Sequence, residues 1–239
     1  MRNPAHSSTP SLCSIPARRR AFLLGILGVL GFLGLMGSSL QAAPVKGTKP
    51  VSPAVSKAAE LALAAFAKND FETARTEFNR LLTLDPDNLT GLVNLGTVEY
   101  RLKNMAEAER LLKRAVRIEP DAPLAWWTLG VVYCDQDKLD AALAALTQAV
   151  LLDPKNASAH NYLAVVVGKK GWTDGAEQEF QRAIELAPDS AEAHFNLALL
   201  YIQRDPPALE LARRHYKKAL ELGAAPDSMI DKALSESKP

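Results

Sequence analysis

The sequence has only two cysteines, and this scarcity limits how the fold can be stabilised. Cys13 lies in an N-terminal segment that we expect to be removed on export, which would leave Cys134 as the single thiol. No intramolecular disulfide is then possible, so we expect packing to stabilise the fold. With 239 residues, 48% of them hydrophobic, the chain is long enough to bury a sizeable core.

A cluster of basic residues is also lacking beyond the N-terminus. The formal net charge is +1, but residues 1–42 carry four arginines and no acidic residue. The remainder has 24 basic and 27 acidic residues, a formal charge of −3. Because nucleic-acid binding requires clustered lysine and arginine to neutralise phosphates, nucleic acid is not an expected partner.

Sequence motifs of catalysis and of metal binding are missing as well. The chain has no G-x-S-x-G nucleophile elbow and no glycine-rich phosphate loop. None of His160, His194 and His215 stands four residues from a second histidine, as a helical metal site would require. We therefore expect a protein that is not an enzyme and that uses no metal and no cofactor.

The N-terminal segment, residues 1–42, has the layout of an export signal. A basic run ending at Arg20 precedes an apolar stretch, residues 21–36, and small residues around Ala42 suit a signal peptidase. The apolar stretch is shorter than the roughly 20 residues that span a bilayer core. We predict a cleaved signal peptide, residues 1–42, and an exported protein of the periplasm or cell envelope. The alternative is an uncleaved membrane anchor.

The signal also has a twin-arginine character. Residues 19–23, R-R-A-F-L, resemble the export pattern R-R-x-F-L, and glycines dilute the apolar stretch as in such signals. Arg18 and Leu24 depart from that pattern, which prefers serine or threonine and often has lysine at those positions. The ordinary export route for unfolded chains therefore stays an alternative.

Proline recurs at a fixed interval through most of the chain. Pro86, Pro120, Pro154 and Pro188 are evenly spaced, and each follows an apolar helical stretch. Proline cannot continue a helix, and the polar residues after it can cap the next one. The constant interval therefore predicts pairs of helices that repeat along the chain.

Two further sets of residues keep the same phase. The first set has spacings of four and then three residues, which form one stripe on the second helix of each pair. Its members are Ala74, Phe78, Leu81, Ala108, Leu112, Ala115, Ala142, Leu146, Ala149, Ala176, Phe180 and Ala183. The second set places a small residue after leucine on the first helix, where it allows close approach of two helices in a hairpin. Its members are Leu95-Gly96, Leu129-Gly130, Leu163-Ala164 and Leu197-Ala198.

These residues resemble the tetratricopeptide-repeat (TPR) family from residue 55 to about residue 222. The fullest match is given by Trp126, Leu129, Gly130, Tyr133, Ala142, Leu146, Ala149 and Pro154. The resemblance implies an all-α fold, a right-handed α-solenoid of about five helix hairpins with a short C-terminal capping helix. Residues 203–207 interrupt the fifth repeat and imply two extra residues in its turn.

The expected organisation of the chain follows from this alignment. The signal is followed by a linker, 43–53, and by five repeats within 54–222. A capping helix and tail, 225–239, close the chain. The expected repeats are 55–88, 89–122, 123–156, 157–190 and 191–224.

The resemblance also implies a concave groove, lined by first-helix residues, that holds a protein or peptide partner. The predicted partner-binding residues are Asn94, Tyr100, Arg101, Trp127, Asn161, Tyr162, Phe195 and Asn196. In the family, a clamp for a peptide carboxylate uses paired lysines and an arginine. Only Arg101 is basic here, so we do not expect that specificity. We expect aromatic anchors, Trp127 and Tyr100 foremost, with Asn94 and Asn196 bonding the partner's backbone.

Two other features have a structural and a functional interpretation. His160 and His194 occupy equivalent repeat positions, so a two-histidine site between neighbouring repeats is one interpretation, and packing is the one we favour. Cys134 is expected on the concave side, where apolar packing is favoured over a redox role.

We therefore predict a non-enzymatic scaffold or adaptor of the bacterial cell envelope that binds a protein or peptide segment in an apolar groove. The alternative is a membrane-tethered assembly factor of a secretion or polysaccharide-export machine. In either case, contact with a membrane is expected only through an uncleaved N-terminal segment.

Overall fold

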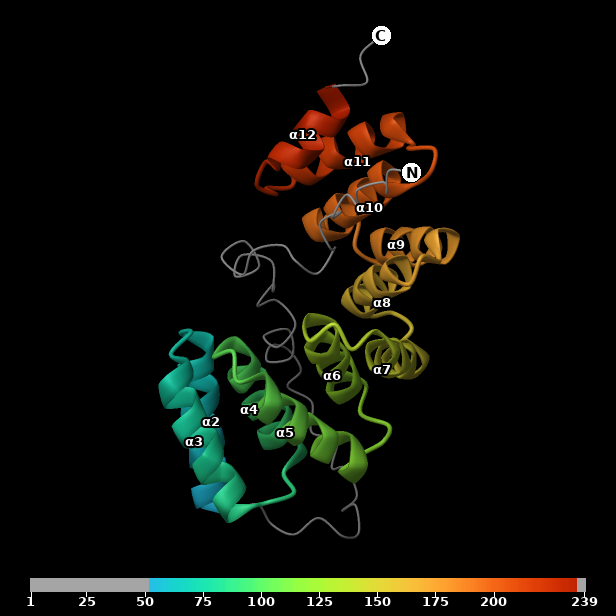
Figure 1. The fold of residues 1–239 in the computed structure, drawn as a ribbon. Helices are drawn as coiled ribbons and strands as arrows, with labels where there is room; N and C mark the ends of the chain where they lie inside the picture. Colours follow the sequence, from blue (N-terminus) through green and yellow to red (C-terminus); the bar gives the residue numbers. More distant parts are fainter. Residues whose placement is uncertain (1–51, 236–239) are drawn as a thin grey trace, which may run out of the picture. The chain divides into compact units, whose positions relative to one another are not determined.

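The computed structural model describes residues 52–235, and all regular structure in this part is helical (Figure 1). The predicted signal peptide and the first nine residues of the predicted linker lie outside the described residues. Within residues 52–235, no helix has the length and apolar character needed to cross a membrane. The predicted all-α class is confirmed for this part of the chain.

The described residues form two compact units. The helices of the N-terminal unit, residues 52–118, are α2 (Pro53–Ala67), α3 (Phe71–Leu84), α4 (Leu89–Arg101) and α5 (Met105–Ile118). The helices of the C-terminal unit, residues 119–235, are α6 (Pro123–Asp135), α7 (Leu139–Leu152), α8 (Ala157–Lys169), α9 (Thr173–Leu186), α10 (Ala191–Gln203), α11 (Leu209–Glu221) and α12 (Ser228–Ser235).

Within each unit, consecutive helices pack as hairpins that stack on one another. The hairpins are α2 with α3, α4 with α5, α6 with α7, α8 with α9, and α10 with α11. In the C-terminal unit the first helices α6, α8 and α10 also contact each other in sequence order, so they line up side by side. The predicted pairing of helices is confirmed.

The turn inside each of the first four hairpins uses the same backbone device. The last residue but one of the turn has a positive φ at Asn69 (59°), Lys103 (68°), Asp137 (58°) and Gly171 (82°). These four positions keep the even spacing of the repeat prolines. A left-handed residue after a helix is a common way to end it, and it favours glycine or asparagine. Lys103 is therefore the least suited to its position.

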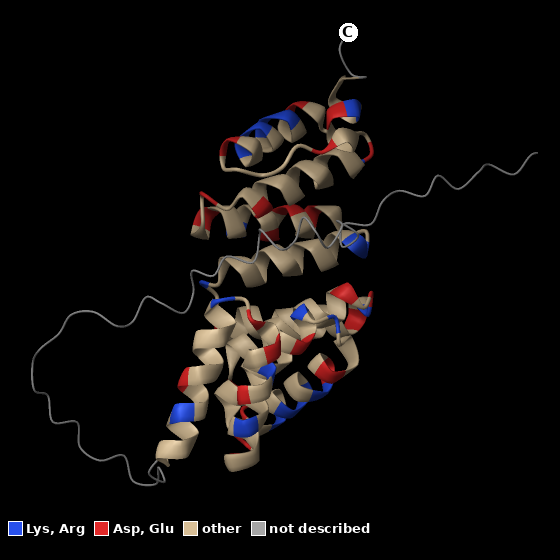
Figure 2. Cartoon of the chain, turned by 90° about the vertical axis from the view of Figure 1, so that its left-hand side faces the viewer, with Lys and Arg blue, Asp and Glu red and all other residues tan. Residues whose placement is uncertain are grey.

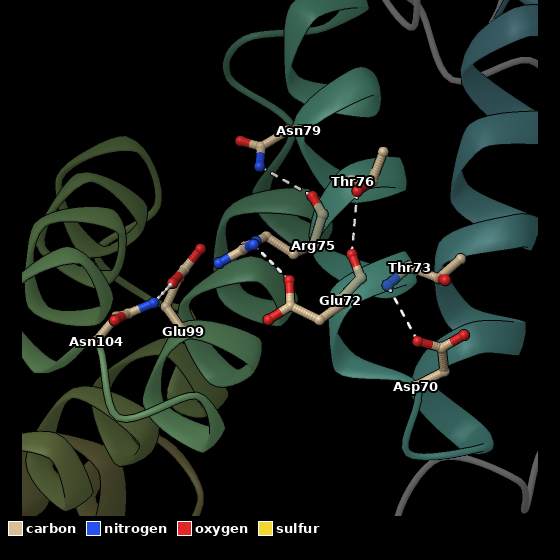
Figure 3. A network of polar contacts seen from close by, with 8 residues as sticks. All are labelled: Asp70, Glu72, Thr73, Arg75, Thr76, Asn79, Glu99 and Asn104. Atoms are coloured by element: carbon tan, nitrogen blue, oxygen red, sulfur yellow. Dashed lines mark hydrogen bonds and ion pairs between the residues drawn. The ribbon is translucent and has the colours of Figure 1, made fainter.

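Side-chain caps begin most of the first helices. Asn88, Asn156 and Ser190 each accept a hydrogen bond from the backbone N–H three residues later, as Ser52 does at α2. At the start of α3, Asp70 accepts from the N–H of Thr73 at 3.2 Å, and Glu72 pairs with Arg75 (Figure 3). The bonds to backbone N–H groups satisfy donors that a helix N-terminus leaves open, whereas the Glu72–Arg75 pair joins two side chains.

The first and second helices of each hairpin meet through a matched pair of residues. A Cβ atom added at Gly96 would lie 2.8 Å from Leu112 Cγ, and one added at Gly130 would lie 2.5 Å from Leu146 Cγ. In the other three hairpins the equivalent pairs are Ala62 with Phe78, Ala164 with Phe180, and Ala198 with Tyr216, all of them buried. A glycine on the first helix is therefore paired with a leucine on the second helix, and an alanine on the first helix is paired with an aromatic residue on the second.

The last hairpin departs from this regularity in its turn. Five residues separate α10 from α11, whereas three residues separate the two helices of each other hairpin. The difference is the two-residue insertion that the sequence predicts. Beyond it, the short helix α12 packs on α10 and α11 and buries Ile230 and Leu234. The predicted capping helix is thus present.

Candidate partner-binding surface

The first helices of the C-terminal unit are almost free of charge. Each of α6, α8 and α10 contains one charged residue, Asp135, Lys169 and Glu192 respectively. The blue and red residues of Figure 2 fall mainly on other helices, such as α11, which has six. Depletion of charge is typical of the central part of protein–protein interfaces.

Two predicted binding residues, Trp127 on α6 and Tyr162 on α8, form an aromatic pair. Their ring centroids lie 6.3 Å apart with the planes at 75°, which is an edge-to-face contact. Both side chains are half-buried. The Nε1 atom of Trp127 is shielded from solvent and has no hydrogen-bond partner among the described residues. The pair bridges two neighbouring repeats and keeps part of each ring accessible.

The two predicted asparagines of the C-terminal unit also bond to each other. Asn196 Nδ2 on α10 donates to Asn161 Oδ1 on α8 at 3.2 Å, and each residue is only 3% exposed. This bond leaves the Asn161 amide N–H groups and the Asn196 carbonyl oxygen for further bonding. The pair is buried and links the two adjacent helices α8 and α10.

Phe195, the remaining predicted anchor of this unit, packs on the second helix of its own hairpin. Its ring lies 6.2 Å from that of Tyr216 at an angle of 62°. The side chain is half-buried, so part of it stays accessible. Of the five predicted residues in the C-terminal unit, four thus form two pairs between repeats, and Phe195 is fixed by α11.

The three predicted residues of the N-terminal unit all lie on α4 and make local contacts. Asn94 Nδ2 donates to Thr90 O at 2.8 Å, and the Arg101 guanidinium lies 5.5 Å from the centre of the Phe71 ring. Tyr100 is 6% exposed, and the Lys103 ammonium lies 5.7 Å from its ring centre. Tyr100 therefore offers little ring surface to a partner, and the partner-binding role of all three residues stays a prediction.

A polar network on α4 was missed by the sequence prediction. Glu99, 5% exposed, accepts a 2.6 Å hydrogen bond from Asn104 Nδ2 (Figure 3). Glu99 stands where the third and fifth repeats have Tyr133 and Tyr201. The bond gives this buried carboxylate a partner in place of ring packing.

A second missed feature links the start of each C-terminal hairpin to the turn before it. Trp126 Nε1 donates to Pro120 O at 2.7 Å, His160 Nε2 contacts Pro154 O at 3.1 Å, and His194 Nε2 contacts Pro188 O at 3.3 Å. Because a carbonyl oxygen can only accept, both histidine Nε2 atoms carry hydrogen. A ring with an N–H group six residues after the repeat proline is the sequence signal that could have revealed it.

The other ring nitrogen of each histidine bonds within the same hairpin. His160 Nδ1 lies 2.6 Å from Glu179 Oε2, and His194 Nδ1 lies 3.0 Å from His215 Nδ1. These bonds do not join His160 to His194, as a two-histidine site between repeats would. Within residues 52–235, no group of three or more histidine, cysteine or acidic residues could hold a metal ion.

Burial changes the titration of several groups in the last hairpin. Burial lowers the pKa of His194, and burial together with the nearby His194 and Arg214 lowers the pKa of His215. Burial and a bond to Glu177 raise the pKa of Tyr201 to about 12. Cys134 is buried, with 1% exposure, and is not part of a disulfide within residues 52–235, which agrees with a packing role.

Comparison with protein families identifies the repeat. A model described as "Tetratricopeptide repeat" matches residues 59–123, and one described as "TPR repeat" matches residues 132–171 and 169–204. Together these matches cover more than half of the chain. No curated protein matches the chain.

Solved structures with similar folds include several TPR proteins. TTC0263, a thermophilic TPR protein of Thermus thermophilus, is 25% identical with a TM-score of 0.61, covering 76% of this chain and 100% of its own. YrrB, described as a TPR protein with an unusual peptide-binding site, is 25% identical with a TM-score of 0.57, covering 74% and 89%. MamA from Desulfovibrio magneticus RS-1 is 18% identical with a TM-score of 0.64, covering 75% and 100%, and it shows the fold alone.

Proposed function

The chain belongs to the tetratricopeptide-repeat family, and on that premise we propose that it is a non-enzymatic scaffold whose helices α6, α8 and α10 hold a segment of a partner protein. The observation that carries the proposal is the coincidence of three features on these helices. They carry one charged residue each, an aromatic pair that bridges two repeats, and an amide pair that bridges the next two.

The proposed recognition is mainly apolar. Trp127, Tyr162 and Phe195 would cover apolar side chains of the partner, since partly exposed aromatic rings held by packing lose little entropy on binding. Asn161 and Asn196, each 3% exposed and bonded to each other, would hold α8 against α10 and so keep the rings of Tyr162 and Phe195 in place. The surface therefore suits a short segment with apolar side chains.

A structural relative supports this choice of ligand class. YrrB, which is 25% identical to the chain with 74% of the chain covered, is described as a TPR protein with an unusual peptide-binding site. That description belongs to YrrB. Together with the geometry of α6, α8 and α10 it favours a peptide segment over a small molecule as the ligand of this protein.

The test is a comparison of two tryptophan substitutions. Trp127→Ala removes one ring of the aromatic pair, whereas Trp172→Ala removes an exposed tryptophan, 54% accessible, that stands in the turn before α9 and not on α6, α8 or α10. Crosslinking in intact cell envelopes followed by mass spectrometry identifies the partner, and titration with its purified segment gives the affinity. Loss of a central aromatic anchor costs about 2 kcal/mol or more, roughly a thirtyfold loss of affinity.

The control separates loss of binding from loss of folding. Trp172→Ala should bind as the wild type does, and both variants should keep the helical circular dichroism of the parent. Equal affinity of Trp127→Ala and wild type for the identified segment would contradict the proposed surface.

The location in the cell envelope is a second part of the proposal, and it rests on the sequence of residues 1–42. We expect the mature protein in the periplasmic fraction, with an N-terminus after Ala42 or Ala43. Fractionation with N-terminal sequencing checks this. A membrane-bound protein that keeps residues 1–36 would instead favour the alternative role of a tethered assembly factor.

A further inference from the structure

His194 on α10 and His215 on α11 form a direct bond between the two helices of the last hairpin. Their Nδ1 atoms lie 3.0 Å apart, whereas the ring centroids lie 5.2 Å apart with the planes inclined at 28°. The nitrogens are much closer than the centroids, so the rings meet edge to edge and not face to face. The lone pair of one nitrogen therefore faces the N–H group of the other.

The position of the shared hydrogen follows from the neighbours. His194 Nε2 donates to Pro188 O, so in the neutral ring His194 Nδ1 is an acceptor. His215 Nδ1 must then be the donor, and His215 Nε2 carries the lone pair that takes up the first added proton. A second proton on His194 Nδ1 would place two N–H groups 3.0 Å apart and break the bond.

The preceding hairpin has a different partner at the equivalent place. Glu179 on α9 faces His160 there, and the two-residue insertion makes His215 its counterpart on α11. A carboxylate accepts from an imidazolium, so the His160–Glu179 pair accommodates protonation of the ring. Two histidines cannot both be protonated and remain bonded. Neighbouring hairpins should therefore respond differently to acid.

We propose that the His194–His215 pair makes the α10–α11 hairpin a proton-sensitive element, which loosens on acidification while α8–α9 stays closed. Two protons taken up by the pair replace an N–H···N bond by repulsion between two cations across the helix interface. The lost contact is the polar link between α10 and α11 beside Phe195 and Tyr216.

The charged surroundings oppose double protonation. On α11, Lys218 acts on His194 and Arg214 acts on His215, and both disfavour a positive ring. Glu177 on α9 favours a positive charge on His215. Its carboxylate already accepts hydrogen bonds from Tyr201 and Arg204, however, and Arg204 also pairs with Asp174. The Tyr201 ring lies 5.8 Å from that of His215. It adds no charge in acid, because the pKa of Tyr201 is raised to about 12.

The direction of the pH effect follows from the two lowered pKa values. In the folded chain each histidine has a pKa below its ordinary value of 6.5. Between the folded pKa and pH 6.5 the unfolded chain therefore binds more protons than the folded chain. The stabilisation of the folded chain by the neutral histidine pair is complete above about pH 6.5, and it is lost as the pH falls through the folded pKa values.

The binding surface would respond to the same protons. Phe195 and Asn196 follow His194 directly on α10, so a loosened hairpin would displace one anchor and one amide of the proposed surface. This consequence, a weaker hold on the partner in acid, rests on the proposed function. The pair itself is tested without any partner, so the two proposals fail separately.

The experiment compares hydrogen exchange of the whole chain at pH 7.5 and pH 5.0, corrected for intrinsic rates. Wild-type α10 and α11 should lose protection by about tenfold, which corresponds to a loss of one bonded contact, and α8 and α9 should keep theirs. His215→Gln retains an N–H donor and cannot titrate, so α10 and α11 should change little in this variant. The matched control His160→Gln should leave the wild-type response of α10 and α11 in place.

An equal loss of α10–α11 protection in wild type and His215→Gln would overturn the proposal. Should His215→Gln fold poorly, ring-nitrogen NMR of the wild type decides the question. Two coupled titrations of His194 and His215, both below the ordinary histidine range, support it. Two independent titrations at the ordinary value refute it.

Discussion

The close contact between Gly130 and Leu146 predicts that Gly130→Ala destabilises the protein, although replacing glycine by alanine inside a helix normally stabilises it. A Cβ atom at residue 130 would lie 2.5 Å from Leu146 Cγ, 2.8 Å from Leu146 Cδ2 and 3.3 Å from the Leu146 backbone nitrogen. Leu146 is fully buried, and the contacted Cγ is the branch point of its side chain, so moving it aside would displace both methyl groups within the core. Gly130→Ala must therefore push α6 and α7 apart.

The expected magnitude is the balance of two effects. Replacing glycine by alanine inside a helix usually stabilises it by about 1 kcal/mol. Overpacking a well-filled core costs about 1–3 kcal/mol, and a clash that reaches the neighbouring backbone belongs in the upper part of that range. We expect Gly130→Ala to lower the free energy of unfolding of the C-terminal unit by about 1–2 kcal/mol.

Urea unfolding followed by tryptophan fluorescence is the suitable assay, because Trp126, Trp127 and Trp172 all lie in the C-terminal unit. Gly175→Ala on α9 is the matched control. Its added Cβ would meet only Val167 Cγ1, at 3.3 Å, so this substitution should be neutral or stabilise by up to about 1 kcal/mol.

A second substitution tests the cause. Leu146→Phe in the Gly130→Ala background rebuilds the pair found at Ala164 and Phe180. The double variant should be more stable than the sum of the single changes by about 1 kcal/mol, since contacting residues are not additive. If Gly130→Ala stabilised the unit as Gly175→Ala does, or if the two changes simply added, the steric explanation would be refuted.

Two further predictions concern the turns. Lys103→Gly should stabilise the N-terminal unit by about 1 kcal/mol, because Lys103 has φ = 68°, and urea unfolding followed by circular dichroism measures this. Gly171→Ala, where φ is 82°, should destabilise the C-terminal unit. Equal effects of the two changes on the free energy of unfolding would contradict the turn argument. Trp126→Phe should cost about 1 kcal/mol by losing the bond from Nε1 to Pro120 O, measured with the remaining tryptophans, and Trp126→His should retain most of the stability, as the equivalent His160 and His194 suggest.

Much of the fold could be predicted because its determinants are local and periodic. The repeat prolines mark where helices end, and the small residues at Gly96, Gly130, Ala164 and Ala198 mark where two helices approach. Even the longer turn of the last hairpin was visible, since Ala212 and Tyr216 resume the pattern two residues late. Each of these signals acts within one hairpin.

The candidate site was less predictable because its contacts join different helices. The sequence places Trp127, Tyr162, Asn161 and Asn196 on first helices, but the two pairs that they form depend on how α6, α8 and α10 pack. Burial of Tyr100 to 6% likewise depends on packing. The His194–His215 bond was hidden for another reason. With the two-residue insertion allowed for, the sequence aligns His215 with Glu179, but this alignment does not show which residue of α11 lies beside His194.

The pairing of glycine with leucine and of alanine with an aromatic residue also has a consequence for how such a chain can be inherited. A duplication or deletion whose ends fall between hairpins carries both members of a pair together. An event that ends inside a hairpin would join Gly130 to Phe180, or Ala164 to Leu146, and would leave a void or a clash where the two helices meet. Genetic exchange between repeats should therefore survive when it moves whole hairpins, and the hairpin, more than the sequence period, is the heritable unit of this protein.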